Sequence, residues 1–452
     1  MSSHSQIKPL ISLNNNSPLI GEIVIPGDKS ISHRSLIFGA LANGVSTIEG
    51  LLEGEDVIKT AIALESMGVE IEKNFGGIWK VNGVGVCGLT EPKDVLDMGN
   101  SGTSSRLLMG LVSSFHFNSF FTGDASLRKR PMKRVFDPIK EIGAQIYSRS
   151  NDTLPALIIG ASDPLPINYT MKVASAQVKS AILLSALNIG GTTTIIEPEK
   201  CRDHSEIMMR SLGLDIKSED IEINGKIGTK ITFNGNKEFD SKSFKVPGDI
   251  SSAAFLIVAA LITKDSNLKI KNVGLNPLRD GILKTLIEMG GDIKLSNERL
   301  ENGEKVADIT IKYSNLKAVN VPAHRAPSMI DEYPILAIAA ANAIGTTRMD
   351  GIEELKVKES NRLNAINEGL IKSGVKTKMG DDFLEVTGGI NQPKELIEIK
   401  TYMDHRIAMS FLIMGLNLKN GLKIDDSLMI NTSFPGFVDL FFKFGVKFKD
   451  AK

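Results

Sequence analysis

A repeated alternation of apolar and polar stretches predicts a chain built from six copies of one α/β unit. Each copy ends in a helix-like segment, a Gly and a short strand-like run, as in LESMGVEI around Gly68. Five more copies, spaced 70 to 84 residues apart, centre on Gly143, Gly213, Gly290, Gly374 and Gly445. Gly accepts a positive φ at the end of a helix, so each of these residues is expected to end a surface helix.

A second pattern precedes each glycine: a polar cluster followed by a stretch rich in Ala, Leu and Ile. SHRSLIFGALANGVSTI and DEYPILAIAAANAIGTT are two examples. A helix that is apolar nearly all round must lie inside a domain. Each unit is therefore interpreted as strand, buried helix, strand, surface helix and further strands. Chance similarity among ordinary α/β segments is the alternative, and the near-equal spacing of two linked patterns argues against it.

The length of 452 residues exceeds that of one ordinary core, so two domains are expected. A polar stretch at residues 234–243, NGNKEFDSKS, separates the third and fourth units. We place one domain at residues 23–243 and the other at 1–22 plus 244–452. The residues before Ile23 hold no full unit, so they can cross over and join the C-terminal domain.

Composition excludes several classes of protein. Lys plus Arg and Asp plus Glu number 53 each, and this balance argues against a nucleic-acid or acidic-membrane binder. The two cysteines form no CxxC and the six histidines form no HExxH, so we expect neither disulfides nor a metal. The N-terminus lacks a long apolar run, so we expect no secretory signal or membrane anchor and a cytoplasmic protein.

The candidate chemistry lies in the polar clusters, where the predicted helices begin. Unpaired N–H groups and the helix dipole favour anions at such positions. The first helices offer Lys29, Ser30, Arg34, Asn100, Gly102, Arg106, Ser175, Gln177, Asp331, Asp404 and Arg406, and the second helices offer Arg130, Arg202, Lys358, Glu359 and Arg362. Taken singly, each could be a solvated charge or a helix cap, and the case depends on their recurrence. Unit four begins with DISSAA, which holds no cation, and is expected to contribute structure only.

Many cations with a few carboxylates suit two phosphorylated carboxylic acids as ligands. In chain order, PGDKSISHR, GNSGTSSR, GDASLRKRPM, ASAQVKSA, RAPSMIDEYP, VKESNRL, DHRIAMSF and TSFPGF closely resemble the 5-enolpyruvylshikimate-3-phosphate synthase family. The sequence is most similar to the divergent bacterial branch that includes glyphosate-tolerant members.

The resemblance implies the α/β (α+β) enolpyruvyl transferase fold, with six βαβαββ repeats, three in each of two domains that close over the substrates. It implies transfer of the enolpyruvyl group of phosphoenolpyruvate to the 5-hydroxyl of shikimate 3-phosphate, with release of phosphate through a tetrahedral intermediate. This reaction belongs to the shikimate pathway to chorismate and the aromatic amino acids. It implies no cofactor and no metal.

The resemblance also assigns roles by motif. Contacts to shikimate 3-phosphate are implied for Lys29, Ser30, Arg34, Ser175, Ala176, Gln177, Arg202, Asp331 and Lys358. Contacts to phosphoenolpyruvate are implied for Lys29, Asn100, Gly102, Arg130, Gln177, Arg362 and Arg406. Asp331 is the implied general base at the hydroxyl, and Lys29 and Glu359 are the implied carriers of the proton at the enol methylene.

Two positions bear on the phosphoenolpyruvate pocket. Thr432 in NTSFP stands where many relatives have Lys, so one cationic contact is absent or supplied elsewhere. Gly102 is retained where glyphosate-tolerant relatives can carry Ala. We therefore hypothesise that glyphosate has ordinary access to the phosphoenolpyruvate pocket.

Two alternatives stay open. The sister enzyme acting on UDP-N-acetylglucosamine shares the fold and phosphoenolpyruvate but carries a catalytic Cys (sometimes Asp) in a mobile loop, and GDASLRKRP has no Cys. A non-catalytic anion-binding scaffold would have no need of Asp331 or Glu359. The expected partners are small-molecule substrates, with no nucleic acid and no membrane. We expect a monomer because the unit pattern closes within one chain.

Overall fold

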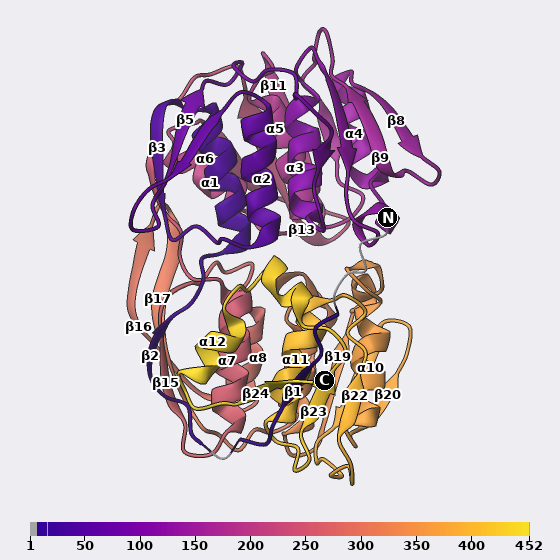
Figure 1. The fold of residues 1–452 in the computed structure, drawn as a ribbon. Coiled ribbons are helices and arrows are strands. Elements are labelled where there is room, and N and C mark those ends of the chain that lie inside the picture. The colour runs from indigo at the N-terminus through magenta and orange to yellow at the C-terminus, as the bar shows by residue number, and fades with distance from the viewer. Residues whose placement is uncertain (1–6, 16, 452) are drawn as a thin grey trace. The chain divides into compact units, whose positions relative to one another are not determined.

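The computed structural model describes residues 7–15 and 17–451, drawn in Figure 1. Residues 1–6 and 16, which belong to the predicted second domain, lie outside the described residues, as does residue 452. The chain divides into two compact units. The N-terminal unit comprises Gly27–Pro247 and Leu300–Glu304. The C-terminal unit comprises Gly248–Arg299 with the described residues up to Pro26 and from Lys305 onward.

The N-terminal unit holds three repeats, each with one four-stranded sheet and two helices. The first has β14 (Ser243–Lys245), α1 (Lys29–Leu41), β3 (Asn43–Glu49), α2 (Glu55–Ser66), β4 (Glu70–Lys73) and β5 (Trp79–Val84). The second has β6 (Leu96–Asp97), α3 (Gly102–Val112), β7 (Asn118–Thr122), η1 (Leu127–Lys129), α4 (Lys133–Ile142), β8 (Gln145–Arg149) and β9 (Thr153–Ile159). The third has β10 (Asn168–Thr170), α5 (Ala176–Ala186), β11 (Thr192–Glu197), α6 (His204–Ser211), β12 (Ile216–Ile223) and β13 (Lys226–Asn234).

The C-terminal unit holds the other three repeats. The fourth has β2 (Ile20–Val24), α7 (Ile250–Ile262), β15 (Asn267–Gly274), α8 (Gly281–Glu288), β16 (Asp292–Glu301) and β17 (Glu304–Lys312). The fifth has β18 (Asn320–Val321), η2 (Ala323–Ser328), α9 (Tyr333–Ala341), β19 (Thr346–Asp350), η3 (Glu353–Val357), α10 (Arg362–Lys372), β20 (Lys376–Met379) and β21 (Phe383–Thr387). The sixth has β22 (Ile397–Ile399), α11 (His405–Gly415), β23 (Leu422–Ile424), η4 (Leu428–Thr432), α12 (Phe437–Phe442), β24 (Phe448–Asp450) and β1 (Leu10–Ser12).

The six sheets share one arrangement of four strands, although in the sixth sheet the third strand is β1 from the start of the chain. In each sheet an edge strand pairs in parallel with the strand that follows the buried helix. Each unit has its own hydrophobic core, and the first helix of each repeat lies in it. In α7, for example, residues 250–261 are all buried. The six repeat glycines all have φ between 75° and 115°, which confirms the prediction that left-handed residues end the surface helices.

Repeats one and four exchange their edge strands. β2 pairs with β15 in the C-terminal unit, with Ile23 opposite Ile270, and β14 pairs with β3 in the N-terminal unit. The units therefore divide after Pro26 and after Pro247, a few residues beyond the positions expected from the sequence.

The crossing segment after Pro26 leads directly into the first candidate motif. The backbone N–H of Asp28 donates to the Pro247 carbonyl oxygen at 2.7 Å. A Cβ on Gly27 would lie 1.9 Å from the carbonyl oxygen of Gly50, so only glycine permits this close backbone approach. No helix among the described residues has the length and apolarity to cross a membrane.

Candidate active site

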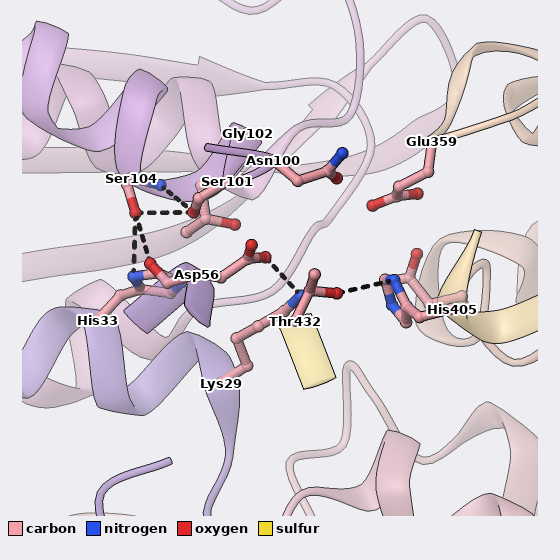
Figure 2. Close-up of polar contacts among 12 residues, drawn as sticks. Lys29, His33, Asp56, Asn100, Ser101, Gly102, Ser104, Glu359, His405 and Thr432 are labelled. Atoms are coloured by element: carbon pink, nitrogen blue, oxygen red, sulfur yellow. Dashed lines mark hydrogen bonds and ion pairs between the residues drawn. The ribbon is translucent and has the colours of Figure 1, made fainter. Parts of the chain in front are cut away.

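In the N-terminal unit, Lys29 begins α1 and faces a carboxylate. The side chain of Asp28 caps the helix by accepting from the Ile31 N–H at 2.9 Å. The Lys29 ammonium lies 3.0 Å from Oδ2 of Asp56, and the two side chains are 18% and 10% exposed (Figure 2). Sequence reasoning missed Asp56. It lies at the start of α2, a position that carries candidate cations in other repeats, so the repeat pattern could have found it.

Arg34 is buried one turn further along α1. Its Nε donates to Oγ of Ser205 at 2.7 Å, and Nη1 donates to the carbonyl oxygen of Ser30 at 2.9 Å. Burial lowers the pKa of Arg34 to about 10, partly opposed by Glu206 and other carboxylates. The positive charge of Arg202, half-buried before α6, also lowers that pKa. Arg34, Ser30 and Arg202 therefore belong to one positively charged region.

A second cluster surrounds the start of α3. Arg130 donates to the carbonyl oxygen of Asn100 at 3.2 Å and to its Oδ1 at 2.6 Å. Arg106 Nη1 donates to Oε1 of Gln177 at 2.7 Å. Gly102 is the first residue of α3, and a Cβ there would meet the guanidinium groups of both Arg106 and Arg130. Two arginines thus gather at one helix N-terminus, where anions are favoured.

The third repeat adds the start of α5 to this unit. Ser175 caps α5 by accepting from the Val178 N–H at 3.5 Å, and Ala176 is the first residue of the helix. The Nε2 of Gln177 donates to Oγ1 of Thr103 at 3.0 Å. Gln177 therefore ties α5 to α3, which follows the Asn100 loop.

A buried ion cluster lies next to Arg202 in the sequence. Lys179, 1% exposed, lies 3.0 Å from Glu197 and 2.8 Å from Glu206, and it donates to the carbonyl oxygen of Cys201 at 3.2 Å. Burial alone would lower the pKa of Lys179, but the facing carboxylates raise it above its usual value. The cluster fixes the turn that carries Arg202. Sequence reasoning did not find Glu197 or Glu206, which carry no motif.

A buried polar network joins the first three helices (Figure 2). Nδ1 of His33 lies 2.7 Å from Oγ1 of Thr60, which lies 2.7 Å from Oγ of Ser104. Ser104 in turn lies 2.7 Å from Ser101, the N-cap of α3. Burial holds the pKa of His33 well below its usual value, with a further contribution from Lys29. His33 is a neutral structural group that ties the Lys29 helix to the Asn100 loop.

In the C-terminal unit, three carboxylates surround one arginine. Arg362 begins α10 and is 1% exposed. Its Nε donates to Oδ2 of Asp404 at 2.8 Å, its Nη1 donates to Oδ1 of Asp331 at 3.2 Å, and its Nη2 pairs with Glu359. Burial would lower the pKa of Arg362, but Asp404, Glu359 and Asp331 raise it. The guanidinium thereby fixes both candidate acid-base groups, Asp331 and Glu359.

Arg406 lies beside this cluster, at the start of α11. Its Nη1 donates to the carbonyl oxygen of Asp331 at 3.0 Å, and its backbone N–H donates to Oδ1 of Asp404 at 2.9 Å. Burial lowers the pKa of Lys358, and Asp331 opposes this shift. The Lys358 ammonium therefore belongs to the same region.

Thr432, the residue that replaces a Lys of many relatives, ends η4 and is buried. Its hydroxyl donates to the carbonyl oxygen of Met429 at 2.7 Å and lies 3.5 Å from Nδ1 of His405 (Figure 2). This position supplies no cation.

The structure thus gathers the predicted residues into two sets, one in each unit. The N-terminal set comprises Lys29, Ser30, Arg34, Asn100, Gly102, Arg130, Ser175, Ala176, Gln177 and Arg202. The C-terminal set comprises Asp331, Lys358, Glu359, Arg362 and Arg406. The first can hold phosphate and carboxylate groups, and the second adds the carboxylates that proton transfer needs. Within residues 7–15 and 17–451, no group of three His, Cys, Asp or Glu side chains is placed to hold a metal ion.

Comparison with solved structures identifies the class. The enolpyruvyl transferase NikO from Streptomyces tendae matches with a TM-score of 0.77 at 17% identity, over 98% of this chain and 99% of that chain. The fold is therefore that of the enolpyruvyl transferases. An EPSP synthase from Acinetobacter baumannii matches with a TM-score of 0.86 at 42% identity, over 98% of this chain and 100% of that chain.

The sequence comparisons narrow the class to one family. A 3-phosphoshikimate 1-carboxyvinyltransferase of Paramagnetospirillum magneticum is 52% identical over 97% of this chain and 98% of its own length. One from Parvibaculum lavamentivorans is 51% identical over 95% of each. Residues 13–441 match the family described as EPSP synthase (3-phosphoshikimate 1-carboxyvinyltransferase). The chain belongs to this family, and the predicted family, fold and enolpyruvyl transferase activity are confirmed.

Proposed function

We propose that the two residue sets serve one reaction, the transfer of enolpyruvyl from phosphoenolpyruvate to the 5-hydroxyl of shikimate 3-phosphate. The observation that carries this proposal is the placement of Asp331 and Glu359 on the same guanidinium, that of Arg362. A receptor for anions gains nothing from carboxylates among its cations, whereas an enzyme that moves protons at an anionic substrate needs them.

Binding of the two substrates is divided among the residues of both sets. Shikimate 3-phosphate is bound by Lys29, Ser30, Arg34, Ser175, Ala176, Gln177, Arg202, Asp331 and Lys358. Phosphoenolpyruvate is bound by Lys29, Asn100, Gly102, Arg130, Gln177, Arg362 and Arg406. Arginine pairs with carboxylate and phosphate oxygens through two parallel hydrogen bonds, which fixes the orientation of each anion. Fixed cations also stabilise charge on the departing phosphate without reorganising.

The reaction proceeds by addition and elimination. Asp331 accepts the proton of the 5-hydroxyl while the hydroxyl oxygen bonds to C2 of phosphoenolpyruvate. C3 gains a proton at the same time, and the product is a tetrahedral phosphate ketal. A proton then leaves C3, the C2–O bond to phosphate breaks and the double bond returns. Lys29 and Glu359 carry the proton to and from C3. Arg362 holds the carboxylates of Asp331 and Glu359 in place for these steps.

The roles of the carboxylates are tested by Asp331→Asn and Glu359→Gln, with Glu368→Gln as the matched control. Glu368 is an exposed carboxylate on the same helix as Arg362. Loss of a positioned acid or base lowers kcat by about 10²–10⁴-fold. We expect that loss for Asp331→Asn and Glu359→Gln and an unchanged kcat for Glu368→Gln. A kcat within tenfold of the parent for Asp331→Asn, at unchanged substrate KM, would remove it as the base.

We further propose that the protein works as a monomer in the cytoplasm. Each repeat glycine ends a surface helix, and all four strands of each sheet come from this one chain. This supports a protein that folds without strands from a second copy. Sedimentation equilibrium at micromolar concentration tests the monomer, and a concentration-dependent dimer mass would refute it.

A further inference from the structure

The fourth repeat carries an arginine where other repeats carry predicted ligands. Arg130 precedes α4, Arg202 precedes α6 and Arg362 begins α10. Arg279 precedes α8 in the same way and is 3% exposed. The sequence pattern missed it because α7, the first helix of this repeat, begins with uncharged side chains. Because Arg279 is buried, we expect it to support another side chain and not to contact an anion directly.

Arg279 belongs to a line of contacts that ends at Arg406. Nη2 of Arg279 donates to Oγ of Ser251 at 2.6 Å and lies 3.2 Å from Oδ1 of Asp249. Ser251 Oγ in turn bonds to Oε1 of Glu332, and the same oxygen lies 3.5 Å from Nη1 of Arg406. Arg279, Ser251 and Glu332, which we call the Arg279 relay, are all buried, and Glu332 is 1% exposed.

The hydrogen bonds of the Arg279 relay have only one possible direction. A guanidinium donates and never accepts, so Ser251 must accept from Arg279 and can give its single proton only to Glu332. The carboxylate of Glu332 then accepts from Ser251 and faces Arg406. A buried carboxylate is stable as an ion only when such partners satisfy it. The relay therefore fixes one of the two oxygens that Nη1 of Arg406 faces, and the other is the carbonyl oxygen of Asp331, the residue next to Glu332.

We propose that Arg279 and Ser251 are positioning residues that set the guanidinium of Arg406 for phosphoenolpyruvate. The inference rests on the proposed role of Arg406 as a ligand of that substrate. Neither residue is expected to touch a reacting atom, because both act through Glu332. Arg279 also supports Asp249, the N-cap of α7, so its removal has two effects and Ser251 gives the cleaner test.

Ser251→Ala removes the link without removing a charge, and Ser252→Ala is its control. Ser252 is the next residue on α7, is also buried and lies outside the Arg279 relay. We expect Ser251→Ala to raise the KM for phosphoenolpyruvate about tenfold. The KM for shikimate 3-phosphate should stay unchanged, as should both constants in Ser252→Ala. An unchanged KM for phosphoenolpyruvate in Ser251→Ala, or an equal rise for both substrates, would overturn the proposal.

Arg406→Lys, measured in parallel, separates this inference from the proposed function. If Arg406→Lys leaves the KM for phosphoenolpyruvate unchanged, the proposed role of Arg406 fails and the relay has no target. If Arg406→Lys raises that KM and Ser251→Ala does not, the role of Arg406 stands and the relay is refuted.

A double-mutant cycle tests the order of contacts. Arg279→Lys keeps a positive charge but changes the donor to Ser251, and in a relay its effect passes through that hydroxyl. In the Ser251→Ala background, Arg279→Lys should therefore add nothing to the KM for phosphoenolpyruvate. If the rise in this KM in the double variant equals the product of the rises in the two single variants, the residues act independently, which would contradict the relay.

Discussion

Replacement of Gly102 by Ala should separate substrate affinity from stability. A Cβ at this position would lie 2.8 Å from Nη1 of Arg106 and 3.2 Å from Nη1 of Arg130. Non-bonded heavy atoms are at their optimum beyond about 3.5 Å, so the tip of the Arg106 side chain must shift by roughly 0.7 Å. The atoms that must move are the flexible ends of two cations, and the backbone of α3 can stay in place.

The magnitude follows from the contacts that this shift disturbs. Arg106 holds Gln177 at 2.7 Å, and Arg130 holds Oδ1 of Asn100 at 2.6 Å. A hydrogen bond to a charged group contributes about 1.5–3 kcal/mol, so loss of about half of one such bond raises the KM for phosphoenolpyruvate roughly threefold to twelvefold. Gly102 has no left-handed φ, so Ala restricts the unfolded chain and contributes about 0.4–1 kcal/mol to stability. This gain offsets the weakened hydrogen bond, so the free energy of unfolding should stay close to the parent value.

The assay is steady-state phosphate release with phosphoenolpyruvate varied at saturating shikimate 3-phosphate, together with urea unfolding. Gly190→Ala is the control, because a Cβ at Gly190 meets no atom within 4 Å. It should gain the full ~0.4–1 kcal/mol of stability and keep the parent KM. The reasoning is refuted if Gly102→Ala keeps the parent KM for phosphoenolpyruvate, or if its KM rises only because the folded state is lost.

Two further predictions concern buried charge in the N-terminal unit. The pKa of His33 is held well below 6.5, so the unfolded chain takes up the extra proton first and stability falls by up to about 1.4 kcal/mol per pH unit below pH 6.5. His33→Asn should remove its share of this slope in urea unfolding at pH 5 and 7, and an unchanged slope would contradict the assignment. Lys179→Met leaves Glu206 and its neighbouring carboxylate buried without their cation and should cost about 3–5 kcal/mol. Lys200→Met, which breaks the exposed pair with Asp220, should cost below about 1 kcal/mol, and equal losses would refute the role of burial.

Local signals in the sequence predicted the repeats well. A glycine that needs a left-handed φ and a helix that is apolar on every face are each set by neighbouring residues. The same holds for polar side chains at helix starts, because the unpaired N–H groups there are a property of the helix itself. Lys29 and Arg362 could therefore be placed at helix starts without a structure.

Features that depend on distant pairing could not be predicted. β2 has only one buried residue in five, so its sequence carries no clear strand pattern and does not indicate a partner some 250 residues away in β15. Glu206 lies in a segment without a motif, and Glu332 follows Asp331 within RAPSMIDEYP with nothing to indicate its partners. The partners of both carboxylates are known only once the helices have packed. Arg279 was overlooked because α7 begins with uncharged side chains, and nothing in the sequence links Arg279 to its partner Ser251 in that helix.

The central claim is most directly tested by phosphate release from phosphoenolpyruvate, with shikimate 3-phosphate in one reaction and UDP-N-acetylglucosamine in another. The account predicts release with shikimate 3-phosphate alone. Asp331→Asn should abolish most of that release, since the carboxylate beside Arg362 is assigned the first proton transfer. Release with only the sugar nucleotide would contradict the substrate assignment, and release with neither acceptor would contradict the proposed reaction.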